Sequence, residues 1–285
     1  MNIAITGSGG YIGRKLMIKL RKENHTILVI PRKQLYEPTV ILDQTLRKAD
    51  GVIHLSGATI LQRWTAKNKQ EIYDSRVRTT ENLVQAVNNL NANERPHFFI
   101  AVSAVGIYKA GESHSESSNS FANDFLGNVV KDWEKASIDL SPNVRRIIFR
   151  MGVVLGPGSK TLQSMTPLFR LGLGAILGNG KQAFPFIHID DVLRAFDQAI
   201  KNEVFRGTYN LASPQRINNK QFSRALASQL NRRVFLIIPG FALKLVFGSA
   251  SRLLLQSPEV IPQKLLDIHF EFNKQTITDT LLGIE

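Results

Sequence analysis

The chain has 285 residues, of which 43% are hydrophobic and 21% are charged, a composition typical of globular proteins with one large domain or two smaller ones. It contains no cysteine, which excludes a disulfide framework, thiolate metal ligands and a cysteine nucleophile. We predict no metal site. The formal net charge is +13. The basic residues are scattered along the sequence with few aromatic residues between them, so we expect no nucleic-acid partner.

Targeting and membrane signals are weak. The first apolar run meets glycine at once and has no basic segment before it, so we predict no signal peptide. The most apolar later stretch, residues 234–247, is interrupted by Pro239, Gly240 and Lys244 and is too short to span a bilayer. We therefore expect a cytoplasmic protein with no membrane partner, either a monomer or a homodimer.

Apolar runs alternate with helical patterns through the first two thirds of the chain, which is typical of βαβ units. Strands are expected at residues 2–6, 26–30, 51–56, 98–103 and 144–155. Helices are expected at residues 11–22, 67–90 and 125–140. After Gly156 glycine and proline become frequent, and we expect a helix at 190–201, a strand at 208–212 and a helix at 219–230 capped by Asn218. The order of the elements beyond residue 235 is not predicted.

Three glycines, Gly7, Gly10 and Gly13, lie between the first strand and the first helix. At this spacing the first glycine permits a tight turn and the second lets the backbone approach a pyrophosphate. The third allows close packing of helix and strand. The helix N-terminus then offers free N–H groups to the phosphates. A glycine-rich turn that binds nothing is the alternative, but its position at the head of a βαβ series favours dinucleotide binding.

The end of the second strand distinguishes the two nicotinamide cofactors. An acid there would bond the ribose 2′-hydroxyl of NAD, whereas this strand is followed by Pro31, Arg32 and Lys33. Arg32 can present a planar fork of donors to a 2′-phosphate, although an exposed surface arginine is also common. We therefore predict NADP(H) as the cofactor.

The residues quoted so far resemble the extended short-chain dehydrogenase/reductases, and four further stretches narrow the resemblance. They are residues 54–58, the loop Arg63-Trp64-Thr65 with Ser75-Arg76, residues 150–156, and residues 186–191. Together they resemble the atypical branch known as epimerase-family proteins, whose C-terminal domain of unknown function resembles residues 263–266. The resemblance covers essentially the whole chain.

The expected fold is therefore α/β. Residues 1–155 form a Rossmann-type doubly wound parallel sheet that binds NADP, to which the chain returns near residues 186–212. Residues 156–285 form a smaller C-terminal α+β region on the substrate side.

The resemblance also implies roles for individual residues. Tyr11 and Ile12 belong to the phosphate turn, and Leu55 and Ser56 would line the cofactor where the third strand ends. Further cofactor contacts are implied for Glu71, Arg76 and Val154, the last on the nicotinamide side. For Glu71 and Arg76 the alternative is a surface pair on a helix, which would contribute little.

The chain has only part of the catalytic residue set that the resemblance implies. Such enzymes use a serine after the fourth strand, a position filled by Ser103, and a Tyr-x-x-x-Lys pair on the next helix, where the tyrosine moves the proton. That helix has no tyrosine. Tyr108 is the tentative substitute and His188 a second one, although we favour His188 as a structural residue that caps or braces the helix after it.

Arg63 and Trp64 are candidate substrate residues that would clamp an anion and stack on a ring. The alternative is that they only pack their loop. Two functions are consistent with these residues. One is an NADP(H)-dependent oxidoreductase or nucleoside-diphosphate-sugar epimerase whose small-molecule substrate is unknown. The other is an NADP(H)-binding sensor or interaction module without turnover.

Overall fold

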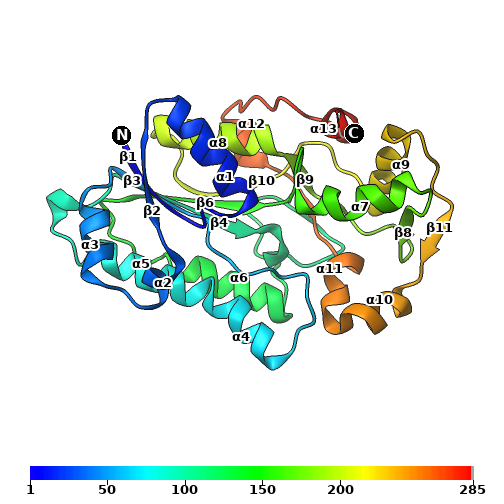
Figure 1. Cartoon of the computed structure of the whole chain (residues 1–285), viewed down its shortest axis with the longest axis horizontal. Helices are drawn as coiled ribbons and strands as arrows, with labels where there is room; N and C mark the ends of the chain where they lie inside the picture. The colour runs from blue at the N-terminus through cyan, green and yellow to red at the C-terminus, as the bar shows by residue number, and fades with distance from the viewer. Residues whose placement is uncertain (284–285) are drawn as a thin grey trace.

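Residues 1–283 are described by the computed structural model, in which six parallel strands form the central sheet in the order β10-β6-β4-β3-β1-β2. Figure 1 shows this sheet in the middle of the molecule. Its strands are β1 (Asn2–Thr6), β2 (Thr26–Ile30), β3 (Gly51–His54), β4 (Phe98–Ala104), β6 (Arg145–Met151) and β10 (Gly207–Leu211). The predicted α/β, Rossmann-type fold is confirmed.

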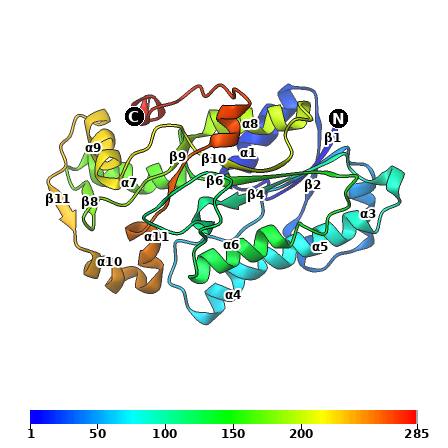
Figure 2. The same cartoon turned by 180° about the vertical axis from the view of Figure 1, so that it is seen from behind.

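Helices cover both faces of the sheet (Figures 1 and 2). The helices on one face are α1 (Tyr11–Lys22) and α8 (Ile189–Lys201), and those on the other are α2 (Arg32–Tyr36), α3 (Val40–Arg47), α5 (Val77–Asn88) and α6 (Phe125–Lys135). Ile5 and Phe149 are buried in a core with α1 and α8, while Val52 and Phe99 are buried in a core with α3 and α5. Burial on both faces explains why the strands are nearly continuous apolar runs.

The direction of winding reverses between β1 and β3. The chain leaves β1 to pair β2 on one side of it, then crosses back so that β3 pairs on the other side. Parallel strands that diverge in this way leave a crevice at their carboxyl ends, where α/β proteins bind ligands. Gly7 follows β1 and Leu55 follows β3, so both lie at this switch point.

Two predicted elements are divided in the structure. In place of the single helix expected at 67–90, the structure has α4 (Ala66–Asp74) followed by α5. The break lies at Ser75 and Arg76. The Ser75 hydroxyl accepts a hydrogen bond from the Ala58 amide at 2.9 Å. The strand expected at 144–155 is β6 followed by β7 (Val153–Leu155), which pairs with β9 (Phe186–His188) instead of continuing in the main sheet. In both places a tertiary contact overrides the local pattern.

The predicted N-cap at Asn218 is confirmed. Asn218 caps the helix after it with a reciprocal capping box to Gln221. The segment that includes α8 and β10 returns to the main sheet, since β10 pairs with β6. The helix expected at 125–140 is shorter, because α6 ends at Lys135.

The remaining elements lie mostly at the end of the molecule away from α3 (Figures 1 and 2). They are β5 (Ser113–His114), α7 (Lys160–Arg170), β8 (Ala175–Leu177), α9 (Asn219–Gln229), β11 (Leu236–Ile238), α10 (Gly240–Phe247), α11 (Arg252–Leu255), β12 (Glu259–Val260), α12 (Gln263–Asp267) and α13 (Ile277–Leu281). Leu265 of α12 is fully buried in the core that contains β10, so the tail packs back on the sheet. Within residues 1–283, no helix has the length and apolar character needed to cross a bilayer.

Candidate functional site

The glycine turn after β1 is built by close backbone contacts. Gly7 has a φ of +68°, and a Cβ there would lie 2.6 Å from the Leu55 carbonyl oxygen. A Cβ on Gly13 would collide with the Gly7 carbonyl oxygen. A Cβ on Gly10 would meet only that same oxygen, at 3.2 Å. Gly7 and Gly13 are therefore needed by the fold itself, while Gly10 borders open space at the switch point.

The first turn of α1 faces this space without a competing group. Gly10 is the N-cap in extended conformation, no side chain caps the helix, and its first turn contains no acid. Its free N–H groups and the positive end of the helix dipole favour an anion. This cradle fits the pyrophosphate of a dinucleotide, and a side chain on Gly10 would fill it.

His54 supports the turn from behind. Its Nδ1 lies 2.8 Å from the Thr6 hydroxyl and its Nε2 lies 3.0 Å from the Thr80 hydroxyl. The Thr6 hydroxyl also accepts a hydrogen bond from the Leu55 amide at 3.1 Å, which links the ends of β1 and β3. Burial lowers the pKa of His54 to about 4, so the ring is neutral at pH 7. The sequence placed His54 in a motif but indicated no role for it.

Arg32 and Pro31 lie at the carboxyl end of β2. Pro31 is the N-cap of α2 and Arg32 its first residue. The Arg32 guanidinium donates to Glu71 at 3.2 Å and to the Tyr36 hydroxyl at 3.3 Å, and these two partners raise its pKa. Both members of the Arg32–Glu71 ion pair are exposed, so the pair contributes little to stability. It does bring Glu71 to the end of β2, beside the guanidinium.

Arg76 lies at the break between α4 and α5, beside the loop that follows β3. Its guanidinium donates to the carbonyl oxygens of Ala58 at 2.9 Å and Ile72 at 3.2 Å, and it stacks over Trp133. No carboxylate of residues 1–283 pairs with it, and burial lowers its pKa to about 10. A half-buried cation with only neutral partners fits an anionic ligand.

Tyr11, His188 and the strand that carries Val154 meet around Gly156. A Cβ on Gly156 would lie 3.1 Å from both the His188 Nε2 and the Tyr11 hydroxyl. Burial, together with Asp190, raises the pKa of Tyr11 to about 12. His188 caps α8, because its Nδ1 accepts the Asp190 amide at 3.2 Å, and burial lowers its pKa. The capping role expected of His188 is confirmed. Ile12 and Val154 are half-buried next to the core.

Ser103 and Tyr108 belong to a buried network at the ends of β4 and β6. Ser103 donates to Glu134 at 2.6 Å, and Arg150 grips the same carboxylate with two bonds of 2.8 and 2.7 Å. Arg150 also donates to the Tyr108 hydroxyl at 2.7 Å, and Tyr108 donates to Asn210 at 2.8 Å. Burial would lower the pKa of Arg150, but Glu134 raises it.

This network does not favour Tyr108 as the proton donor. The side chain is 1% exposed and its hydroxyl has both a donor and an acceptor within the protein. Burial also raises its pKa. Glu134 was missed by the sequence reasoning, although it directly follows Trp133 on the inward side of α6, which was the available signal. Phe125 and Leu126 occupy the region where the usual pair would begin, with Val129 and Val130 one turn on, and none of these four side chains can donate a proton.

Arg63 and Trp64 pack their loop against the C-terminal region. The Arg63 guanidinium donates to the carbonyl oxygens of Val246 at 3.0 Å and Leu245 at 2.9 Å, both in the last turn of α10. The Trp64 indole donates to Ile60 and packs edge-on against Phe125. Arg63 therefore has its donors engaged by α10, and the loop-packing alternative describes the arrangement better than an anion clamp does.

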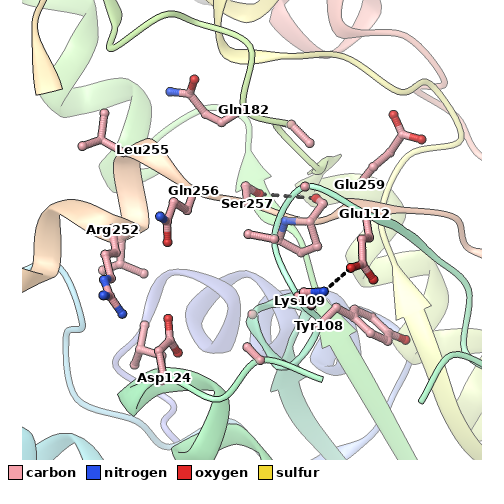
Figure 3. Close-up of a pocket in the computed structure, with 18 of the residues that line it drawn as sticks. Tyr108, Lys109, Glu112, Asp124, Gln182, Arg252, Leu255, Gln256, Ser257 and Glu259 are labelled. Carbon is pink, nitrogen blue, oxygen red and sulfur yellow. Dashed lines mark hydrogen bonds and ion pairs between the residues drawn. The ribbon is translucent and has the colours of Figure 1, made fainter. Parts of the chain in front are cut away.

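A cleft of about 910 Å³ opens beside this loop, between the main sheet and the C-terminal region. In Figure 3 the Arg252 side chain lies across the cleft from Tyr108 and Glu112. Lys109 and Glu112 form an ion pair of 2.5 Å. Arg252 and Lys181 have no ion-pair partner in the described part of the chain. Apart from Trp64 and Tyr108, none of the lining residues was predicted, because they come from separate segments of the chain with no shared motif.

The chain resembles known proteins over nearly all its length. Residues 3–212 match the NAD dependent epimerase/dehydratase family, and residues 238–283 match a domain of unknown function, DUF1731. The epimerase family protein SDR39U1 homolog, chloroplastic, of Arabidopsis thaliana is 32% identical, covering 100% of this chain and 86% of that protein. Epimerase family protein Mb2239 of Mycobacterium bovis is 35% identical, covering 98% and 96%.

Two solved structures share the fold and more than a quarter of the sequence. The crystal structure of human epimerase family protein SDR39U1 (isoform 2) with NADPH superposes with a TM-score of 0.92 at 28% identity, covering 100% of this chain and 99% of that one. The nucleoside-diphosphate sugar epimerase from Corynebacterium glutamicum gives a TM-score of 0.80 at 27% identity, covering 99% of this chain and 57% of that one.

Proposed function

Because the chain belongs to the NAD dependent epimerase/dehydratase family, we propose that it binds NADP(H) at the carboxyl edge of its sheet and acts on a small polar molecule in the adjoining cleft. The observation that carries the proposal is the cradle at Gly10, where an uncapped helix N-terminus borders open space. The NADPH bound to the human relative supports the choice of cofactor.

Different groups of residues contact different parts of the cofactor. Gly7, Gly10 and Gly13, with Tyr11 and Ile12, hold the pyrophosphate on α1. Pro31 and Arg32 receive the 2′-phosphate of the adenine-side ribose, and a phosphate there competes with Glu71 for the guanidinium. Leu55, Ser56 and Arg76 line the cofactor after β3, and Val154 lies on the nicotinamide side. A bound nicotinamide cofactor supplies or accepts a hydride.

The proposed reaction is an oxidoreduction or an epimerisation, with a nucleoside-diphosphate sugar as the first substrate class to test. The C. glutamicum relative supports this class. Arg252 and Lys181 in the cleft, which have no ion-pair partner within residues 1–283, suit an anionic substrate. We also propose a cytoplasmic location, in line with the absence of cysteine.

A second function, NADP(H) binding without turnover, is favoured by one specific observation. On the helix that carries the proton donor in related enzymes, Phe125 and Leu126 occupy the expected region, with Val129 and Val130 one turn on. The Ser103 and Tyr108 hydroxyls are engaged by Glu134, Arg150 and Asn210. A positioned acid typically contributes 10²–10⁴-fold to rate. Its absence predicts slow chemistry or none.

The test is a turnover screen. The protein with NADPH is offered sugar-nucleotide and carbonyl libraries, and cofactor oxidation is followed by absorbance. Any hit is repeated with Tyr108→Phe and His188→Ala. A rate that either substitution diminishes by at least tenfold assigns the donor and supports the enzyme. NADPH binding with no turnover on any compound supports the non-catalytic function instead.

A further inference from the structure

The positive charge of the protein is concentrated in one part of the fold, here named the distal lobe and defined as residues 156–188 and 213–258. These residues include ten lysines and arginines and no aspartate or glutamate. All ten basic side chains are exposed. They are Lys160, Arg170, Lys181, Arg216, Lys220, Arg224, Arg232, Arg233, Lys244 and Arg252. In the sequence these residues are widely spaced and resemble solvated helix faces, but the fold gathers them at one end of the molecule.

These charges are almost entirely free of internal partners. Within residues 1–283, only Arg216 of the ten forms an ion pair, with Glu259 at 2.9 Å. All 23 acidic residues of the chain lie outside the distal lobe. The lobe therefore presents a field of one sign, which attracts anionic surfaces over a Debye length and repels a copy of itself.

The same lobe exposes large apolar side chains in its outermost segments. Strand β11 is exposed at every position, and the preceding Phe235 is 79% exposed. Helix α10 follows directly, with Phe241 69% and Leu245 72% exposed. This is the stretch that the sequence singled out as its most apolar. Figure 1 places β11 and α10 at the rim of the molecule.

Neighbouring segments extend this surface. The Arg232 guanidinium donates to the Arg170 carbonyl oxygen at 2.9 Å. This hydrogen bond connects the segment that precedes β11 to the C-terminal end of α7. Leu171, just past that end, is 72% exposed. We name the surface made by residues 168–173, 232–238 and 241–246 the distal face. It combines several exposed aliphatic and aromatic side chains with Arg170, Arg232, Arg233 and Lys244.

We propose that the distal face binds the surface of an anionic phospholipid bilayer. Peripheral membrane binding requires both features found here, apolar side chains that enter the headgroup boundary and cations that contact acidic lipid. A second copy docked on the same face is disfavoured, because two fields of the same sign would oppose each other. A nucleic acid would use the cations but not the exposed Phe235 and Phe241. The inference revises the expectation of no membrane partner, and it is independent of the proposed cofactor.

The test is co-sedimentation of the full chain with large unilamellar vesicles, either pure phosphatidylcholine or containing 30% phosphatidylglycerol, at 0.05, 0.15 and 0.5 M salt. Binding is expected only with phosphatidylglycerol and should weaken with salt. The double variant Phe235→Ser/Phe241→Ser removes apolar contact, and Arg232→Glu/Arg233→Glu reverses charge. Each should weaken binding roughly tenfold or more, since each basic residue near an acidic surface is worth about a factor of five.

Two matched controls lie at the other end of the molecule. Val40 and Ile41 are 70% and 59% exposed near the start of α3, and Arg21 and Lys22 are an exposed basic pair on α1. Val40→Ser/Ile41→Ser and Arg21→Glu/Lys22→Glu should leave vesicle binding within twofold. Circular dichroism and thermal unfolding are measured on every variant to establish that each is folded.

Four results would overturn the proposal. One is equal binding, or none, with the two vesicle types. Another is loss of binding in the control variants as large as in the distal-face variants. The third is light scattering that shows a dimer which the Phe235→Ser/Phe241→Ser variant dissociates, because the face would then belong to a second copy. Single-stranded DNA that displaces the protein from vesicles without dependence on Phe235 and Phe241 would likewise count against it.

Discussion

Two regions at the same edge of the sheet carry polar groups, and they differ in how far those groups are satisfied. At the ends of β1 and β3, the first N–H groups of α1 have no side-chain cap, and Arg76 has no carboxylate partner among residues 1–283. At the ends of β4 and β6 the Ser103, Glu134, Arg150 and Tyr108 side chains bond one another. Polar groups without hydrogen-bond partners at a sheet edge indicate a ligand-binding site, whereas polar groups that bond one another indicate a structural role.

The two regions also differ in the function that their residues could serve, cofactor binding in the first and proton transfer in the second. The first region has what a dinucleotide requires from a protein, namely a glycine turn and free donors. The second holds the residues from which a proton donor was expected, but it directs them inward. The predictions below test whether the first region is the binding site and the second a structural one.

The largest effect is expected at Gly10. Gly10→Val should abolish NADPH binding, with a loss of at least about a hundredfold, because the side chain fills the cradle. The backbone is extended with a φ of −72°, so the fold should survive. Calorimetric titration and circular dichroism measure the two properties. A folded variant with wild-type affinity would show that the pyrophosphate binds elsewhere.

The closed network is tested at Glu134. Glu134→Ala leaves the Arg150 guanidinium buried without its carboxylate, which should cost about 3–5 kcal/mol of unfolding free energy. Urea denaturation measures the loss, and Lys135→Ala on the exposed side of α6 serves as the matched control. A loss below about 1 kcal/mol, or a change in NADPH affinity without a change in stability, would mean that Glu134 serves the ligand rather than the fold.

A smaller effect is expected at Arg32. Arg32→Ala should reduce the preference for NADPH over NADH by about 1.5–3 kcal/mol, the worth of a hydrogen bond to a charged group. Affinity for NADH should hardly change, because NADH has no phosphate at that position. Parallel titrations of the two cofactors give the difference. An equal loss for both would assign Arg32 a role in folding of the turn.

The smallest effect concerns pH. The pKa of His54 is about 4 in the folded protein against about 6.5 when unfolded. The unfolded state therefore binds more protons between these values, and stability falls as pH falls through this window. From pH 7.5 to 5.5 His54 should account for about 1.3 kcal/mol. His54→Asn should lower the slope of the free energy of unfolding against pH. An unchanged slope would mean that other groups cause the pH dependence of stability.

The fold could be predicted from the sequence further than the site could. Strands such as β1 and β4 were placed to within one residue because buried parallel strands are apolar nearly throughout. The break at Ser75 and Arg76 was not visible, because it depends on Ala58, a residue distant in sequence. The glycine turn was recognisable because its chemistry is in the backbone.

The cleft and the distal face escaped prediction for a different reason. Arg252 and Glu112 come together from loops that are far apart along the chain. The basic residues of the distal lobe are gathered only when two segments, 156–188 and 213–258, pack together. A site assembled from single side chains leaves no local pattern, whereas one assembled from a turn does.

The most direct test of the central claim is a calorimetric comparison of NADPH and NADH binding to the unmodified chain in one buffer. NADPH is expected to bind at least about tenfold more tightly than NADH, which corresponds to about 1.4 kcal/mol. Equal affinities for the two cofactors, or no binding of either at millimolar concentration, would contradict it.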